Sequence, residues 1–161
     1  MFRLAVEKDF DILRQIYSQT VKKLAPSLYS PSQVMAWSSF SDNISKFHDF
    51  IFHANTYLLI KNEQIIGFCG LRNDGHIASF YLHPDFTRQG YGTKLLLYVL
   101  EIGLKQGITR FYTEASFFSQ PVFSRCGFKI LALETVNYGD VSFKRYKMEK
   151  ENNSTGKLSH E

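Results

Sequence analysis

The sequence predicts an α/β (α+β) fold, in which several helices pack against a mostly antiparallel sheet. Three observations predict it. Apolar residues recur at helical spacing near the start of the chain. Short β-branched and aromatic runs, separated by turn residues, follow as candidate hairpins. A glycine-rich segment from His83 to Leu97 then opens a Leu-rich helix.

Composition limits the classes of protein to consider. The 161 residues, 44% of them apolar, suffice for one domain with a substantial core. The net charge of +4 suits an anionic ligand, but Lys and Arg form no dense run, so we expect no nucleic-acid partner. The most apolar stretch, 95–104, contains Glu101 and is too short to cross a bilayer, so we expect no membrane partner.

The N-terminus and the cysteines indicate the compartment. The first ten residues lack the long apolar core and the cleavage site of a secretory leader. Cys69 and Cys126 are the only cysteines, and without a secretory context we expect reduced thiols. We therefore expect a cytoplasmic protein.

Capping and turn residues divide the first half of the chain. Ala25-Pro26 ends the first helix, and Ser30-Pro31-Ser32-Gln33 has the pattern of a capping box that opens a short second helix. Asn62-Glu63 indicates a hairpin turn. The expected elements are a strand at 2–6, helices at 8–24, from 31 to about 37 and at 44–52, and strands at 56–60, 65–71 and 77–82.

The second half opens with the glycine-rich helix, expected from Tyr91 to Lys105 with Gly107 just past its end. A strand at 109–113, a short helix at 120–125 and strands at 128–136 and 141–148 complete the expected fold. Residues 150–161 are polar and lack periodicity, so we expect a domain over 1–149 and a disordered tail.

The segment His83 to Leu97 has the features of an anion site. A helix N-terminus presents unpaired N–H groups, and glycines there let a phosphate approach the backbone. A P-loop does not fit, because Thr93-Lys94 after Gly92 has the wrong order, and Leu95 occupies the third glycine position of a dinucleotide fingerprint. The plain alternative is a helix start with glycines for a tight turn.

Two motifs resemble those of the GNAT acyl-CoA N-acyltransferases. The segment Thr87 to Gly92 is similar to the pyrophosphate motif [QR]-x-x-G-x-[GA], with Thr87 in place of Gln or Arg. The segment Glu114 to Phe128 resembles the later motif N-x-x-A-x-x-x-[YF]-x-x-x-G-F, with serines replacing the Asn and Ala. The segments 29–37, 83–90 and 121–128 further resemble a YafP-like branch.

The resemblance covers 1–149 and implies a GNAT fold, whose sheet is mixed and mostly antiparallel, with a central parallel pair of splayed strands at 77–83 and 109–114. It implies an N-acetyltransferase that moves an acetyl group from acetyl-CoA to a primary amine of a small molecule or peptide by direct attack. The alternative is a non-catalytic acyl-CoA-binding or sensing domain. The implied cofactor-binding residues are Tyr81, Leu82, Arg88, Gln89, Gly90, Tyr91, Gly92, Thr93, Ser116 and Phe123.

The position at which many family members carry their acid holds a residue that cannot transfer a proton, so the acid and the base must be sought elsewhere. Phe123 stands where many relatives have a tyrosine acid, and a phenyl ring donates no proton. Glu114 is a candidate base and Tyr81 a candidate acid; the alternatives are a salt-bridged strand-end carboxylate and a packed strand aromatic. Ser116 has two open roles, as a contact to the cofactor and as a cap of the next helix.

Tyr29 and Trp37 are candidates for lining the acceptor pocket, with simple helix packing as the alternative. The histidines show no metal-binding spacing with cysteine or acidic partners, so we expect no metal. Exposed edges of the last strands could mediate a homodimer.

Overall fold

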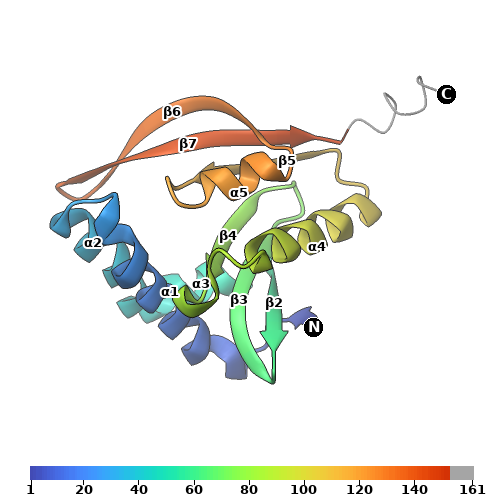
Figure 1. The fold of residues 1–161 in the computed structure, drawn as a ribbon, viewed down its shortest axis with the longest axis horizontal. Coiled ribbons are helices and arrows are strands. Elements are labelled where there is room, and N and C mark those ends of the chain that lie inside the picture. The colour runs from blue at the N-terminus through green and yellow to red at the C-terminus, as the bar shows by residue number, and fades with distance from the viewer. Residues whose placement is uncertain (153–161) are drawn as a thin grey trace.

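The computed structural model describes residues 1–152 (Figure 1). No helix in this range combines the length and apolarity needed to cross a membrane. The elements in chain order are β1 (Phe2–Leu4), α1 (Phe10–Leu24), α2 (Pro31–Ser38), α3 (Ile44–Phe52), β2 (Asn55–Lys61), β3 (Gln64–Leu71), β4 (Ile77–Leu82), α4 (Tyr91–Lys105), β5 (Arg110–Ala115), α5 (Gln120–Arg125), β6 (Lys129–Tyr138) and β7 (Val141–Glu151).

The strands form two antiparallel sheets, which confirms the α+β class. The first sheet has the order β1-β2-β3-β4 and the second has the order β5-β7-β6. The expected single mixed sheet with a central parallel pair is not formed. One edge of β5 pairs with β7 along its length, and the other forms a parallel bridge from Tyr112 to His76, the residue just before β4. Beside this bridge, the Thr113 hydroxyl donates to the Ile77 carbonyl at 2.9 Å.

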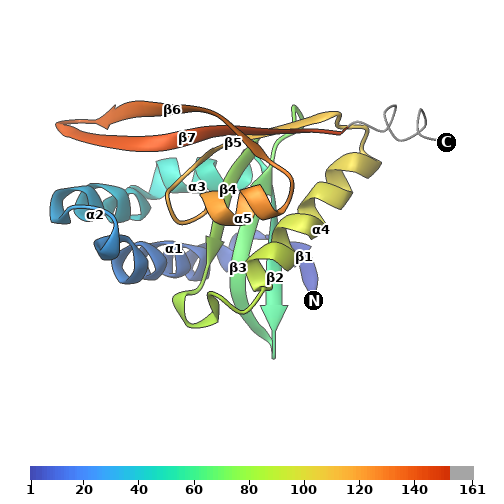
Figure 2. The ribbon, with the colours of Figure 1, turned by 45° about the horizontal axis from the view of Figure 1, so that its top comes forward.

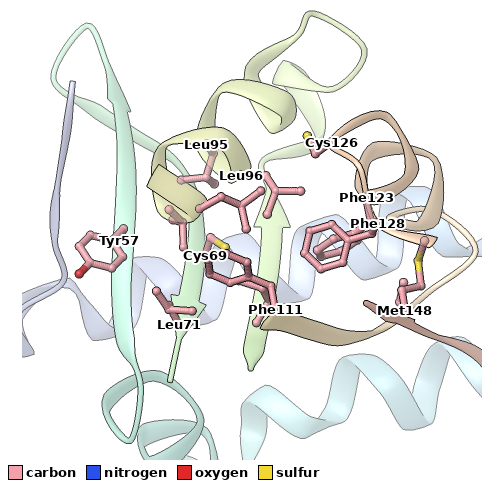
Figure 3. Packing of buried hydrophobic residues seen from close by; sticks show 14 of the residues in the cluster. Tyr57, Cys69, Leu71, Leu95, Leu96, Phe111, Phe123, Cys126, Phe128 and Met148 are labelled. Atoms are coloured by element: carbon pink, nitrogen blue, oxygen red, sulfur yellow. The ribbon is translucent and has the colours of Figure 1, made fainter. Parts of the chain in front are cut away.

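Two apolar clusters cover the two faces of the first sheet. Leu95, Leu96 and Val99 of α4 pack into one cluster, together with Phe111 of β5 and residues of β2 and β3 (Figure 3). The other cluster joins α1 and α3 to the opposite face, where Phe68 is fully buried. Burial on both faces explains why β2 and β3 are almost continuously apolar.

Most local predictions are confirmed. The bounds of α3, β4, α4 and α5 match those expected from the sequence. The capping box of α2 forms both bonds, from the Gln33 N–H to Ser30 Oγ at 3.2 Å and from the Ser30 N–H to Gln33 Oε1 at 2.8 Å. In the β2–β3 turn Asn62 and Glu63 have φ of 51° and 64°, as a tight hairpin turn requires.

The long β6–β7 hairpin lies across the molecule above α5, and its tip reaches α2 (Figure 1). There the Gln33 side chain donates to the Ser142 carbonyl at 2.8 Å. β7 continues to Glu151, two residues beyond the expected end of the domain, because its last residues pair with the start of β5. The rest of the expected tail, 153–161, lies outside the described residues.

Candidate functional site

The candidate site is a cavity of about 490 Å³, a size suited to a small ligand or cofactor. Its lining comes from the end of β4, the N-terminus of α4, α5 and the C-terminal half of α1. Figure 2 shows how these elements are arranged. Segments that are distant in the sequence therefore meet here: Thr20 from α1, Tyr81 from β4, Gly92 from α4 and Ser116 from the loop after β5.

The glycine segment forms one wall of the cavity. Gly90 precedes α4 in the left-handed region with φ of 85°, which favours glycine. No side chain caps α4, and its first backbone bond runs from the Lys94 N–H to the Gly90 carbonyl at 3.1 Å. The N–H groups of Tyr91, Gly92 and Thr93 thus have no partner within the helix. This end of α4 can bind an anion through the backbone.

The outer edge of β4 forms a second wall. The His83 N–H donates to the carbonyl of Ile66 in β3 at 2.6 Å, so the backbone N–H of His83 points toward β3. Because bonded pairs alternate along an antiparallel ladder, the backbone groups of Phe80 and Leu82 point away from β3. The Thr20 hydroxyl confirms this direction, since it donates to the Leu82 carbonyl at 2.8 Å. The Leu82 N–H lies on the same outer edge.

Tyr81 and Trp37 form the inner wall. Trp37 Nε1 donates to the Tyr81 hydroxyl at 3.1 Å, and the Tyr81 ring packs against Tyr17 with centroids 4.7 Å apart. Burial raises the pKa of Tyr81 to about 12. The hydroxyl is therefore protonated at neutral pH and can donate a proton or a hydrogen bond.

Arg88 and Arg125 give the cavity its charge. Arg88 comes from the loop before α4 and Arg125 from the last turn of α5. Among the described residues that line the cavity, no side chain is acidic. The site is thus cationic at the arginines and otherwise neutral.

The other predicted cofactor-binding residues differ in their placement. Ser116 lines the cavity and also accepts from the Ser119 N–H at 3.1 Å, so both of its alternatives fit. The Gln89 side chain donates back to the Asp85 carbonyl at 3.1 Å. The Tyr91 hydroxyl bonds with Lys61.

Phe123 is not brought to the cavity wall. It is 1% exposed and packs in the core against Phe80 and Phe128, with ring centroids 5.3 and 5.0 Å away. A side chain so enclosed has almost no surface left for a cofactor. The α5 residue that lines the cavity beside it is Val122.

Glu114 also lies apart from the residues that line the cavity. Its Oε1 is 2.8 Å from His76 Nε2, at the bridge that joins the two sheets. This hydrogen bond lowers the pKa of Glu114 more than burial raises it. The geometry corresponds to the salt-bridged alternative considered for this residue.

Trp37 lines the cavity, whereas Tyr29 lies behind its wall. The Tyr29 hydroxyl accepts from the Phe117 N–H at 3.0 Å, and its ring stacks on Phe117 with centroids 5.4 Å apart. Tyr29 also borders a second hollow on the side of α2, together with Met35 and Lys22. In residues 1–152 no group of three or more His, Cys, Asp or Glu side chains is placed to hold a metal ion.

Comparisons with known proteins show the family and the fold. The model of the acetyltransferase (GNAT) family matches residues 20–128, more than half of the chain. The chain belongs to the GNAT family of acetyltransferases. Among curated proteins, none matches the sequence significantly.

Solved structures share the fold of this GNAT protein. A GCN5-related N-acetyltransferase from Rhodopseudomonas palustris has a TM-score of 0.89 at 23% identity over 94% of both chains. The PaiA N-acetyltransferase from Thermoplasma acidophilum, in complex with coenzyme A, has a TM-score of 0.74 at 21% identity over 94% of this chain and 98% of that chain. YncA from Salmonella typhimurium, with acetyl-CoA, has a TM-score of 0.65 at 17% identity over 96% and 94%.

Sequence reasoning missed several residues that line the site in this GNAT protein. Thr20, on the predicted first helix, reaches β4 across 62 positions of sequence, and no local signal marks it. Phe117 and Phe118 line the cavity within the second motif, where neither matches a motif position. Arg125 lies two residues before Gly127 in the same motif, and its charge was the signal that could have identified it.

Proposed function

We propose that this protein is an N-acetyltransferase that moves the acetyl group of acetyl-CoA to a primary amine of a small molecule or peptide. The observation that carries the proposal is a single cavity that joins the uncapped N-terminus of α4, the free edge of β4 and the protonated hydroxyl of Tyr81. Membership of the GNAT family supports it.

The residues of the cavity fit acetyl-CoA. The uncapped N–H groups at the start of α4 suit the pyrophosphate, and Arg88 and Arg125 add positive charge for the phosphate groups. The outer edge of β4 offers the Leu82 N–H and the backbone groups of Phe80 to an extended pantetheine arm, as for an added strand. The splay of β4 from β5 beyond the bridge at His76 supports the entry of this arm between them.

Bound acetyl-CoA supplies the thioester that reacts. The amine nitrogen bonds to the acetyl carbon as the carbon–sulfur bond breaks, the amine loses a proton and the thiolate gains one. The Leu82 N–H is placed to stabilise negative charge on the acetyl oxygen. The Tyr81 hydroxyl holds a proton for the thiolate, and Trp37 Nε1 orients that hydroxyl.

Glu114 as the base remains a prediction that the pairing with His76 does not favour. This pairing, and a phenylalanine at the usual acid position, favour the second candidate function, a non-catalytic acyl-CoA-binding or sensing domain.

Membership of a YafP-like branch and a homodimer through β6 also remain predictions. The edge strand β6 exposes Ile130, Leu131 and Leu133.

Two measurements on the purified full chain test the proposal. Calorimetry with acetyl-CoA tests the site, and release of free CoA thiol in the presence of varied primary amines tests the transfer. We expect binding together with thiol release that depends on the amine. Binding without release by any amine would support the sensing domain, and no binding would overturn the site itself.

A further inference from the structure

We propose that the acceptor is a weakly basic aromatic amine, which is neutral at physiological pH, rather than a cationic alkylamine or polyamine. This inference rests on the proposed acetyl transfer and names its substrate class. It follows from the charges, the side chains and the proton donor of the cavity.

The first step concerns charge. Among the described residues of the lining, Arg88 and Arg125 are the only charged side chains, and both are cations. An ammonium group that leaves water for this cavity meets no carboxylate, and burying an unpaired charge is strongly unfavourable. The carboxylate predicted to act as base, Glu114, is outside the lining and is hydrogen-bonded to His76 at 2.8 Å. The site therefore selects against cationic amines.

The second step concerns shape. The apolar part of the lining comes from Leu24 at the end of α1, Leu28 shortly after it, Trp37 from α2, and Phe117 and Phe118 after β5. Flat rings and aliphatic side chains suit an aromatic ring, which stacks or packs edge-on against them. The Trp37 indole is held by its bond to Tyr81, so this surface is pre-arranged.

The third step concerns protons. The amine must be neutral to attack, so a strongly basic amine needs a group that takes its proton first. The described lining contains no Asp, Glu, His or Lys, and its proposed general acid is the Tyr81 hydroxyl. A weakly basic amine arrives neutral and loses its proton only after attack, when it has become strongly acidic. Such an acceptor needs no base in the wall.

The experiment compares aniline with benzylamine, which keeps the ring but is strongly basic, and adds spermidine and an alanine peptide amide. The full chain is saturated with acetyl-CoA and thiol release gives kcat/KM for each amine. We expect aniline to exceed benzylamine by about 10-fold or more, and spermidine by about 100-fold or more, because both cations must be desolvated without a partner. With aniline, the rate should be nearly flat from about pH 6 to pH 9.

A variant pair tests the same idea by changing the cavity wall while the amines stay the same. Leu28 lines the cavity, and 52% of its surface is exposed. A polar substitution there should therefore not disturb folding. Leu28→Glu places a carboxylate in the wall, and Leu28→Gln is its uncharged match. We expect Leu28→Glu to raise the benzylamine-to-aniline ratio of kcat/KM by about 10-fold over Leu28→Gln.

The outcomes distinguish the proposed class of acceptor from the proposed acetyl transfer. A preference for aniline that Leu28→Glu shifts toward benzylamine supports the inference. Equal or faster transfer to benzylamine, spermidine or the peptide overturns it and leaves the acetyl transfer standing. Acetyl-CoA binding with no thiol release for any amine overturns both the transfer and this inference.

Discussion

Gly90 and Gly107 are matched residues at the two ends of α4. Both have φ of 85°, and a Cβ atom at either would meet no heavy atom within 4 Å. Only Gly90 borders the cavity. A substitution therefore brings similar backbone strain at both positions, but it changes the cofactor site only at Gly90.

We predict that Gly90→Glu weakens acetyl-CoA binding by about 100-fold or more, because a carboxylate would face the pyrophosphate and disfavour the same N–H groups. Gly107→Glu serves as the control and should keep the affinity of the native protein. Titration calorimetry of both variants measures the difference. Equal affinity in the two variants would show that the pyrophosphate does not bind at the start of α4.

Tyr81 lines the cavity, and its hydroxyl accepts a hydrogen bond from Trp37 Nε1. We predict that Tyr81→Phe lowers kcat by about 100-fold, in the range of general acid catalysis, with KM for acetyl-CoA nearly unchanged. Since burial raises the pKa of Tyr81 to about 12, its hydroxyl stays protonated and should cause no fall in kcat up to about pH 9.

The control for Tyr81 is Tyr98→Phe, which removes a hydroxyl from α4 on a ring stacked against Phe2, away from the cavity. It should leave kcat unchanged. If Tyr81→Phe keeps native kcat, the tyrosine serves only in packing, and the proton for the thiolate must come from water or from the substrate.

The packing of α4 on β5 is set by a glycine in the last turn of the helix. A Cβ atom at Gly103 would lie 2.5 Å from Cε1 of Phe111, a fully buried core residue. Alanine normally stabilises a helix relative to glycine by about 1 kcal/mol. Overpacking of a core typically costs about 1–3 kcal/mol, so the steric effect should exceed the gain in propensity.

We therefore predict that Gly103→Ala lowers the free energy of unfolding by about 1 kcal/mol, measured by urea denaturation. The same substitution in a Phe111→Leu background should be less destabilising, because the smaller side chain leaves room for the new methyl group. A stabilised Gly103→Ala variant would mean that the helix moves away from β5 at little cost.

At the scale of the whole molecule, substitutions can test the contact between the two sheets. His76 belongs to the connection before β4, and Glu114 belongs to β5, so their hydrogen bond ties the first sheet to the second. The pair is partly buried, with side-chain exposures of 20% and 25%. The pair of His48 and Glu7 has the same 2.8 Å separation but exposures of 39% and 73%, which makes it a natural control.

We predict that Glu114→Gln lowers the free energy of unfolding by about 1 kcal/mol at neutral pH, whereas Glu7→Gln has little effect. The pKa of Glu114 is lowered in the folded protein, so its contribution is present above the ordinary glutamate range and is lost as the pH falls through the lowered value. The difference between native protein and variant should therefore disappear in acid.

The same variant tests catalysis, because thiol release should persist in Glu114→Gln if the carboxylate serves only to connect the two sheets through His76. A loss of kcat at unchanged stability would restore Glu114 as the base. Unfolding followed at several pH values, together with the thiol assay, distinguishes these outcomes.

The sequence by itself determined the local elements and the cofactor motif. Periodicity, caps and glycines act within a few residues, so β4, α4 and α5 could be located from neighbouring side chains alone. Gly90 and Gly92 were identified as an anion site because a helix N-terminus has the same chemistry in any fold. The family motifs extended this to the GNAT fold, and the family match confirmed it.

Only the tertiary structure decided which side chains share a surface. Whether Glu114 faces the cavity or His76, and whether Phe123 is a wall or a core residue, depends on how strands and helices from distant segments pack. Thr20 and Arg125 both line the cavity although they lie 105 positions apart in the sequence, and no local pattern encodes that arrangement. The divergence of β5 from β4 beyond the bridge at His76 likewise divided the expected single sheet into two, because strand pairing depends on residues far apart in the sequence.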